Sequence, residues 1–307
     1  MTLRSVSVGH VALDLMFQID AFPDHPTKKH ADGFFQGVGG MAANSAVALS
    51  RLGAKAAFYG PVGDDTAAPT FLQHFRRQGV DTRHVTPTQG QTNSISAIVT
   101  DASGERMIYS HKGSALQHPG SLDPSCLDHQ DVLLADPRCV AWAEQVMRLA
   151  RQRGLPCLLD GEISPPEDLH RLVPLSQWVA FSDPGLQAYH PGPHADGLAR
   201  ALASGPGVEL AVVTLGGEGL MWQLRGQPAQ RLAGFKVPHV VDTTGAGDTF
   251  HAALAFAWGL GQPPLEALRF ASAAAALKCT QPHGILGAPH QDEVRAFLAG
   301  SAHLLDT

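Results

Sequence analysis

The stretch VVDTTGAGDTF, at Val240–Phe250, places a Gly-Ala-Gly turn between a short apolar run and a helix that we expect over about 249–259. Because Gly245–Gly247 carry small or no side chains, the backbone N–H groups of this turn can converge on an anion, and the helix adds the positive end of its dipole. Asp248 follows at once, and a carboxylate beside an anion site is suited to accept the proton of a hydroxyl that attacks phosphorus. The stretch predicts a phosphate site with a base. A glycine-rich turn with a first-turn aspartate also occurs without such chemistry.

A second glycine-rich segment, GVGGMAANSAVALSRLG at 37–53, lies far upstream. Gly39 and Gly40 permit close backbone approach at the start of a helix, and Asn44, one turn inside, offers a donor and an acceptor to a hydroxyl. Together the two segments resemble the paired signatures of the ribokinase-like (PfkB-type) carbohydrate kinases. The resemblance runs from Ser7 at the first strand to the C-terminal helices. Segments 158–165 and 180–186 are most similar to the branch of sulfofructose kinase and the ketohexokinase-like bacterial sugar kinases.

Short apolar runs alternate with amphipathic segments along the chain. This alternation predicts an α/β fold with a mostly parallel, doubly wound sheet, helices on both faces and ligands at the carboxyl ends of the strands. The expected strands are Ala54–Gly60, Asp131–Ala135, Pro156–Asp160, Trp178–Ser182 and Glu209–Leu215. The expected helices are Thr66–Gly79, Val140–Gly154 and Pro193–Ser204. We expect one ribokinase-like domain over 1–307.

Two segments interrupt the alternation. Residues 16–36 hold a polar PDHPTKKH stretch, and 92–111 show a two-strand pattern that turns at 101–104. Such segments can pair as a small sheet that caps the site, although plain surface loops are the alternative. The resemblance implies a β-sheet lid, formed by about 14–37 and 91–112, which closes over the sugar and forms the contact of a homodimer.

Composition excludes several functional classes. The 307 residues carry 28 acidic and 22 basic side chains, a formal charge of −6, so no basic field is present to bind nucleic acid or an anionic membrane surface. Residues 1–6 lead directly into an expected strand without the pattern of a secretion signal, so we expect none, and no segment reaches the roughly 18–20 apolar residues of a membrane span. The four cysteines lie far apart without metal-site or redox spacing and are expected as reduced thiols. A cytoplasmic enzyme that uses ATP follows.

In phosphoryl transfer the protein mainly aligns the hydroxyl with the γ-phosphate and neutralises charge. Asp248 is the expected base, and the amides of Ala246, Gly247 and Asp248 are expected to hold the phosphoryl oxygens. The resemblance implies that Asp14 binds two sugar hydroxyls; a plain turn aspartate is the alternative. It also implies that the strand end at 214–219 lines the ATP site. The implied nucleotide contacts are Thr214, Gly216, Gly219 and Ala274.

One departure from the family concerns the metal. Members commonly carry an Asn-x-x-Glu motif that organises the water around Mg²⁺, whereas the matching residues here are Ser182-Asp183-Pro184-Gly185. Asp183 could supply the missing carboxylate. By analogy, a potassium site could use the backbone near Asp242 and Thr244 and the loop at 284–287.

The substrate is less defined. Lys28 and Arg138 match positions at which sulfofructose kinases hold the sulfonate, while Ser110 replaces an expected asparagine. An arginine can hold a sulfonate or phosphate through paired N–H donors. A 6-deoxy-6-sulfofructose, another anionic sugar such as 2-keto-3-deoxygluconate, a neutral ketohexose and ribose all stay open.

Two other functional classes compete with a kinase. A sugar or nucleotide sensor that kept the fold without catalysis is favoured mildly by the altered metal motif and opposed by the complete signatures. A dinucleotide-dependent oxidoreductase lacks its glycine fingerprint after the first strand, where Gly9-His10-Val11-Ala12 stands instead.

Overall fold

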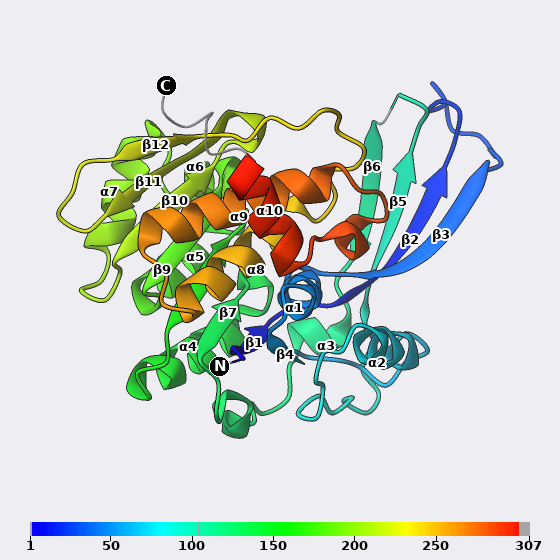
Figure 1. Ribbon diagram of the computed structural model, residues 1–307. Helices are drawn as coiled ribbons and strands as arrows, with labels where there is room; N and C mark the ends of the chain where they lie inside the picture. Colours follow the sequence, from blue (N-terminus) through cyan, green and yellow to red (C-terminus); the bar gives the residue numbers. More distant parts are fainter. Residues whose placement is uncertain (1, 104, 301–307) are drawn as a thin grey trace.

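The computed structural model describes residues 2–103 and 105–300. Its larger sheet has the strand order β12-β11-β10-β9-β8-β7-β1-β4 (Figure 1). The strands from β4 to β10 are parallel, while β11 and β12 continue the sheet antiparallel. Their bounds are β1 Arg4–Val8, β4 Lys55–Tyr59, β7 Val132–Ala135, β8 Cys157–Gly161, β9 Trp178–Ser182, β10 Leu210–Thr214, β11 Gly219–Leu224 and β12 Gln230–Ala233.

The central strands are continuously apolar because helices cover both of their faces. Every residue of β7 and β8 is buried, which explains why the sequence shows runs here rather than alternation. All five expected strands are confirmed to within one residue at each end. The mostly parallel, doubly wound architecture is confirmed with them.

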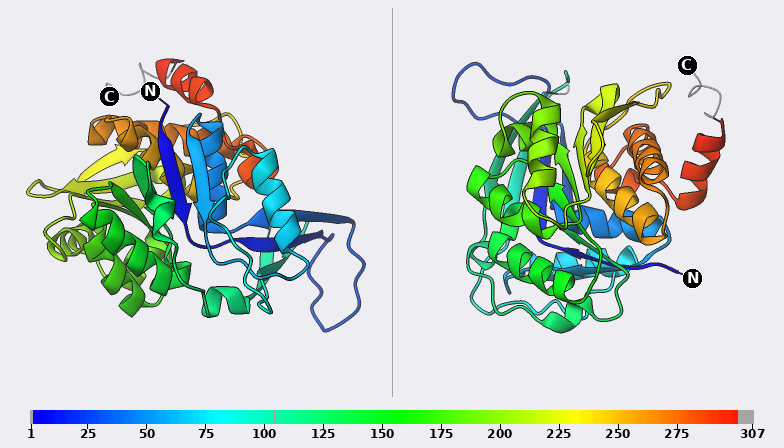
Figure 2. Two further views of the ribbon diagram at one scale, coloured as in Figure 1. Left: turned by 90° about the horizontal axis from the view of Figure 1, so that it is seen from below. Right: turned by 90° about the vertical axis from the view of Figure 1, so that its left-hand side faces the viewer.

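Helices pack on both faces of this sheet (Figure 2). One face carries α1, α2, α8 and α9, and the other carries α4, α5, α6 and α7. The bounds are α1 Met41–Arg51, α2 Ala68–Arg77, α3 Ser114–Gln117, α4 Val140–Gln152, α5 Pro166–Leu172, α6 Asp183–Tyr189, α7 His194–Ala203, α8 Ala246–Gly259, α9 Pro264–Cys279 and α10 Gln291–Gly300. The three expected helices are confirmed as α2, α4 and α7.

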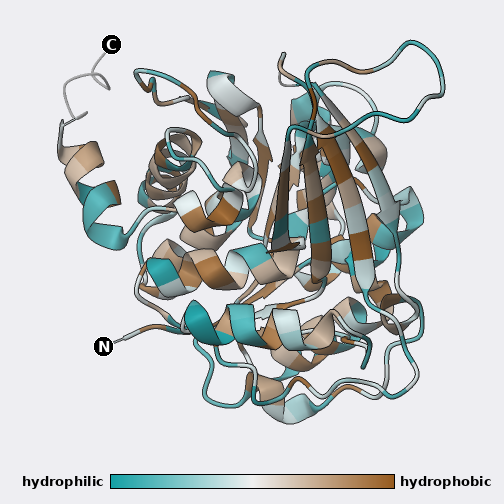
Figure 3. Ribbon diagram, turned by 90° about the vertical axis from the view of Figure 1, so that its right-hand side faces the viewer, coloured by the Kyte–Doolittle hydropathy of each residue, from teal (hydrophilic) through white to brown (hydrophobic). Residues whose placement is uncertain are grey.

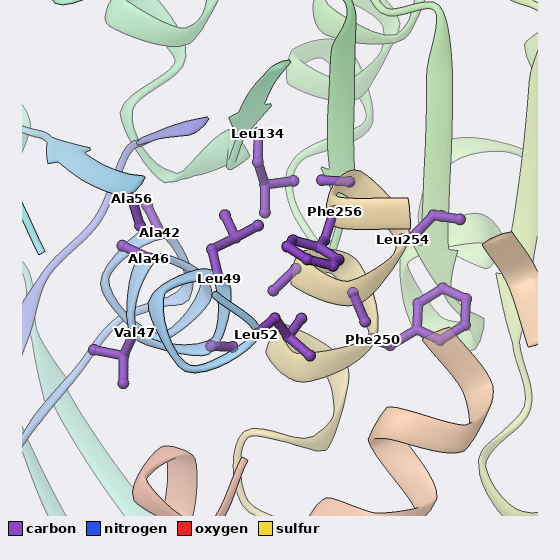
Figure 4. Packing of buried hydrophobic residues seen from close by; sticks show 14 of the residues in the cluster. Ala42, Ala46, Val47, Leu49, Leu52, Ala56, Leu134, Phe250, Leu254 and Phe256 are labelled. Carbon is purple, nitrogen blue, oxygen red and sulfur yellow. The ribbon is translucent and has the colours of Figure 1, made fainter. Parts of the chain in front are cut away.

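Small residues bring α1 against α8 (Figure 4). Ala42 and Ala46 of α1 are almost fully buried, and Leu49 of the same helix packs in one apolar cluster with Leu254 and Phe256 of α8. Because Ala42 and Ala46 are small, the N-terminal part of α1 can lie close to α8, and the N-termini of both helices lie at one end of the sheet. The packing therefore brings the two glycine-rich segments together.

A second, four-stranded sheet has the order β3-β2-β5-β6. It comprises β2 Ala12–Gln18, β3 Gly33–Gly39, β5 Ser94–Thr100 and β6 Arg106–His111, so the two remote segments do pair, through parallel β2 and β5. It projects from the main body and shows hydrophobic bands across its strands (Figure 3). The expected turn at 101–104 includes Gly104, which lies outside the described residues.

Two further findings bear on the class of protein. None of the helices in the described parts of the chain is long and apolar enough to cross a membrane. Cys126, Cys139 and Cys157 are buried, Cys279 is half-buried, and all four are unpaired thiols.

Candidate active site

The phosphate turn lies where α8 begins. Gly245 precedes the helix in the left-handed conformation (φ 79°), which glycine adopts without strain. The helix starts at Ala246, three residues before the expected Thr249, so the whole turn from 246 to 248 lies inside its first turn. The amide of Ala246 donates to Thr243 O at 3.1 Å. The amides of Gly247 and Asp248 lie in the first turn of α8, where backbone N–H groups have no acceptor within the helix, so these two are candidates for contact with an anion.

The carboxylate of Asp248 meets the second glycine-rich segment directly. Asn44 Nδ2 donates to Asp248 Oδ2 at 2.7 Å, and the Ser45 hydroxyl lies 3.4 Å from the backbone oxygen of Asp248. Burial and the nearby Asp160 carboxylate raise the pKa of Asp248 to about 7, against the opposing effects of Asn44 and His251. A carboxylate with such a pKa is matched to proton transfer near neutral pH.

A buried ion pair lies beneath Asp248. His251, one turn further along α8, has its ring nitrogens 2.8 Å from Gly247 O and 2.9 Å from Ala180 O, and its Nε2 is 3.6 Å from Asp160 Oδ1. Because carbonyl oxygens only accept hydrogen bonds, contacts of both nitrogens with carbonyls favour the doubly protonated ring, and the pKa of His251 is raised accordingly. The sequence reasoning gave neither residue a role. The sequence did contain a signal for them, because Asp160 and His251 are each a titratable residue within an otherwise apolar run.

Asp14 lies in a polar row across the small sheet. Its neighbour on β5 is Ser96, which hydrogen-bonds it, and the neighbour of Ser96 on β6 is Ser110, with the two hydroxyls 3.4 Å apart. Cross-strand neighbours project to the same side of a sheet, so these three groups share one face. Burial raises the pKa of Asp14 to about 6. Such a row can bind several hydroxyls of one small molecule.

The glycines expected to contact the sugar have a geometric requirement. A Cβ on Gly39 would lie 2.0 Å from Asp14 Oδ2, and one on Gly40, where φ is 101°, would lie 2.5 Å from His10 O. Only glycine lets the chain pass from β3 into α1 against Asp14 and the end of β1. These two positions therefore place Asp14 and Asn44 around the same turn.

These pKa values predict the pH dependence of catalysis. If Asp248 is the base, it must be ionised to accept a proton, so kcat/KM is expected to rise with pH and level off above about 7. Below that pKa the ionised fraction, and with it kcat/KM, falls about tenfold per pH unit. Initial rates between pH 5 and 9 at constant ionic strength measure the curve. A flat profile across this range would contradict the role of Asp248.

Arg138 lies close to the ends of β1 and β7, where the Asp136 carboxylate binds backbone amides. Asp136, fully buried, accepts hydrogen bonds from the amides of His10, Ala42 and Arg138 at 2.7–3.0 Å. The Arg138 guanidinium donates to Ile163 O at 3.1 Å and, with Lys112, helps to lower the pKa of His10, although burial is the main cause. Arg138 and Lys112 thus act on the same buried histidine, and the sequence reasoning assigned no role to Lys112. Lys28 lies exposed in the loop between β2 and β3.

The expected nucleotide contacts divide into two kinds. Thr214 ends β10, half-buried, and Gly216 follows it with open space where a Cβ would be, so both can meet a ligand. Gly219 has a different task, since a Cβ there would lie 2.1 Å from Leu232 O of β12. Ala274 is fully buried in α9, so the expectation that it contacts adenine was wrong. The structure places its methyl group in the core.

The expected metal ligand also has another partner. Asp183 begins α6 and pairs with His194 at 2.8 Å, and the described residues contain no cluster of three metal-ligating side chains. A Cβ on Gly185 would lie 1.9 Å from Gly161 O, so this backbone has no room for a glutamate at that position. Glu162, at the end of β8, accepts from the Ser182 hydroxyl at 3.1 Å. It supplies a carboxylate at the same sheet edge, which the sequence reasoning missed.

Comparison with known proteins identifies the family of the chain. The model of the pfkB family of carbohydrate kinases matches residues 2–291. Mouse (Mus musculus) ketohexokinase is 32% identical over 292 residues, 89% of this chain and 94% of its own. The crystal structure of a protein from Agrobacterium tumefaciens provisionally named a ribokinase superposes with a TM-score of 0.91 at 31% identity, covering 99% of each chain. Arabidopsis thaliana ribokinase, complexed with ribose and ATP, superposes with a TM-score of 0.86 at 23% identity, covering 97% and 99% of the two chains.

The fold and the site define a phosphotransferase with an alcohol group as acceptor. The chain belongs to the pfkB family of carbohydrate kinases, and it phosphorylates a sugar with ATP.

Proposed function

We propose that this kinase transfers the γ-phosphate of ATP to a hydroxyl of a small sugar, with Asp248 as the base. The observation that carries this is the Asp248 carboxylate, held by Asn44 beside two amides in the first turn of α8. The carboxylate accepts the hydroxyl proton, and the amides of Gly247 and Asp248 hold the phosphoryl oxygens. Asp14, Ser96 and Ser110 orient the sugar from the small sheet, which acts as a lid.

Mg²⁺ is the proposed metal, bound mainly by the phosphates of ATP. When bound, it neutralises charge on the phosphates. The carboxylate of Glu162, held by Ser182, fits the task of ordering its water shell, whereas the carboxylate of Asp183 is engaged by His194. Thr214 and Gly216 line the nucleotide side.

The proposed acceptor is a ketohexose derivative that carries an anionic group. Two observations support it: the similarity to a ketohexokinase, and the positive charges of Lys112 and Arg138, which both act on His10 beside the end of β1. The anion lies against Arg138, and Lys28 can approach from its loop. A sulfonate, a phosphate and a carboxylate share this chemistry, and turnover distinguishes them.

An activity panel tests the acceptor: fructose, 6-deoxy-6-sulfofructose, tagatose phosphate, 2-keto-3-deoxygluconate and ribose. For the preferred anionic sugar, Arg138→Met is expected to raise KM about 10- to 100-fold, because a charge-assisted hydrogen bond contributes about 1.5–3 kcal/mol. KM for fructose should change little. Arg148→Met is the matched control, since Arg148 is an exposed arginine paired with Glu144. Equal losses on fructose and the anionic sugar would exclude an anion pocket at Arg138.

We further propose a homodimer through the lid. Phe34, Met107, Ile108 and Tyr109 of the small sheet are 44–65% exposed, a large apolar surface for a soluble chain. Covering it with a second copy would remove these side chains from water. The four unpaired thiols and the use of ATP favour the cytoplasm as the place of action.

A further inference from the structure

A fully buried lysine lies behind the phosphate turn. Lys278, near the end of α9, has no exposed surface. Its Nζ donates to Asp242 O at 2.7 Å and lies 3.2 Å from Asp242 Oδ2 and 3.4 Å from Gln281 O. A buried ammonium is tolerated only when oxygen atoms compensate for its lost hydration, and here three do.

The carboxylate of Asp242 is hydrogen-bonded to the segment before Gly245 and to the loop at 284–287. Asp242 Oδ1 accepts from Thr244 N and Asp242 Oδ2 from Gly284 N, each at 2.8 Å. Burial would raise the pKa of Asp242, but these hydrogen bonds and the Lys278 charge outweigh it and lower the pKa to about 2. The Asp242 carboxylate is therefore ionised at physiological pH and can pair with the Lys278 ammonium. It joins the end of α9, the segment that leads into Gly245, and the 3-10 turn η5 (Gly284–Gly287).

The oxygens around Nζ are those a potassium ion uses. K⁺ binds backbone carbonyl and carboxylate oxygens, and the expected potassium site involved the backbone near Asp242 and the loop at 284–287. In this structure the ammonium already takes Asp242 O, Asp242 Oδ2 and Gln281 O. The residues present do not fit a further cation among the same oxygens, because two positive charges would share one carboxylate.

We propose that the Lys278 ammonium is a built-in monovalent cation that holds the phosphate turn, so that this enzyme works without K⁺. Lys278 is a positioning residue: it acts through Asp242 on the turn and does not touch the phosphate. The inference rests on the proposed kinase function for its activity readout, but not for its stability readout.

The first experiment uses the unaltered protein. Sugar-dependent ATP turnover and the melting temperature are measured in potassium chloride and in choline chloride at equal ionic strength. We expect kcat to differ by less than about 1.5-fold and the melting temperature to be unchanged. Activation by K⁺ of fivefold or more, or a melting shift specific to K⁺, would overturn the proposal. A protein without turnover on any sugar would refute the proposed function while the melting comparison still decides this inference.

The second experiment opens the site. Lys278→Ser removes the ammonium and leaves the oxygens, so in choline chloride we expect kcat to fall at least tenfold and the melting temperature to drop. K⁺, but not choline, is expected to restore both in part, since it can occupy the vacated position. Lys55→Ser, at an exposed lysine of β4, is the matched control and should match the unaltered protein in both salts. Full activity and stability of Lys278→Ser in choline chloride would show that the ammonium does not position the phosphate turn. If the variant does not fold, the salt comparison on the unaltered protein remains decisive.

Discussion

Asp248→Asn is expected to lower kcat by about 10²- to 10⁴-fold, because an amide cannot accept the proton of the attacking hydroxyl. Asparagine has the same shape, and its amide oxygen can still accept the hydrogen bond that Asn44 donates at 2.7 Å. The variant should still fold and bind ATP, and an unchanged ATP affinity in calorimetric titration would show both. Because the pKa of Asp248 is raised from 3.8 to about 7, its ionisation costs stability as pH rises between these two values, and the whole cost is present above about pH 7. At pH 8 the variant should therefore melt no lower than the unaltered protein.

Asp183→Asn is the matched control for this variant. Asp183 is an exposed carboxylate whose recorded partner is His194, so kcat should stay within about twofold of the unaltered enzyme. A large loss here would restore Asp183 as a metal residue. Activity of Asp248→Asn within threefold of the unaltered enzyme would remove Asp248 as the base.

The fold was predictable because its signals are local. Continuous apolar runs such as Trp178–Ser182 identify buried parallel strands, and the structure reproduces that strand residue for residue. The pairing of β2 with β5 was also expected, from two segments that broke the alternation. Its register was not, since nothing in either segment alone shows that Asp14 meets Ser96.

The site was predictable only where a residue's role depends on its own segment. Gly245 and Asp248 belong to one turn, so their relation could be read directly. Ala274 was misassigned because a helix made of small residues has the same sequence pattern whether it faces a ligand or the core. Only the tertiary packing of α9 shows that Ala274 faces the core. Lys278 was overlooked because a lysine is usually solvated. Its burial depends on Asp242, 36 residues away.

Among the residues of the site, His251 and Asp160 are expected to contribute most to the free energy of unfolding. Burial alone would lower the pKa of His251, but the carboxylates of Asp160 and Asp248 and the carbonyls of Ala180 and Gly247 outweigh it and raise the pKa. Both side chains are at most 5% exposed. Removing one partner therefore leaves an uncompensated charge in the interior.

His251→Leu is accordingly expected to lower the free energy of unfolding by about 3–5 kcal/mol at pH 7, measured by urea denaturation. It should also move the rise of kcat/KM to higher pH. The positive ring favours the ionised form of Asp248, so without it the pKa of Asp248 goes up. A merely structural histidine would not shift this profile.

A double-mutant cycle with Asp160→Asn separates the charge from the packing. Asparagine removes the negative charge and can still accept from the Glu162 amide, which donates to Asp160 Oδ1 at 3.0 Å. If the pair is ionised, His251→Leu should cost at least about 1 kcal/mol less in the Asp160→Asn background, because no buried charge is then left alone. Additive costs, within about 0.5 kcal/mol, would mean that the two side chains pack without an ion pair, and that the field of His251 does not act on Asp248.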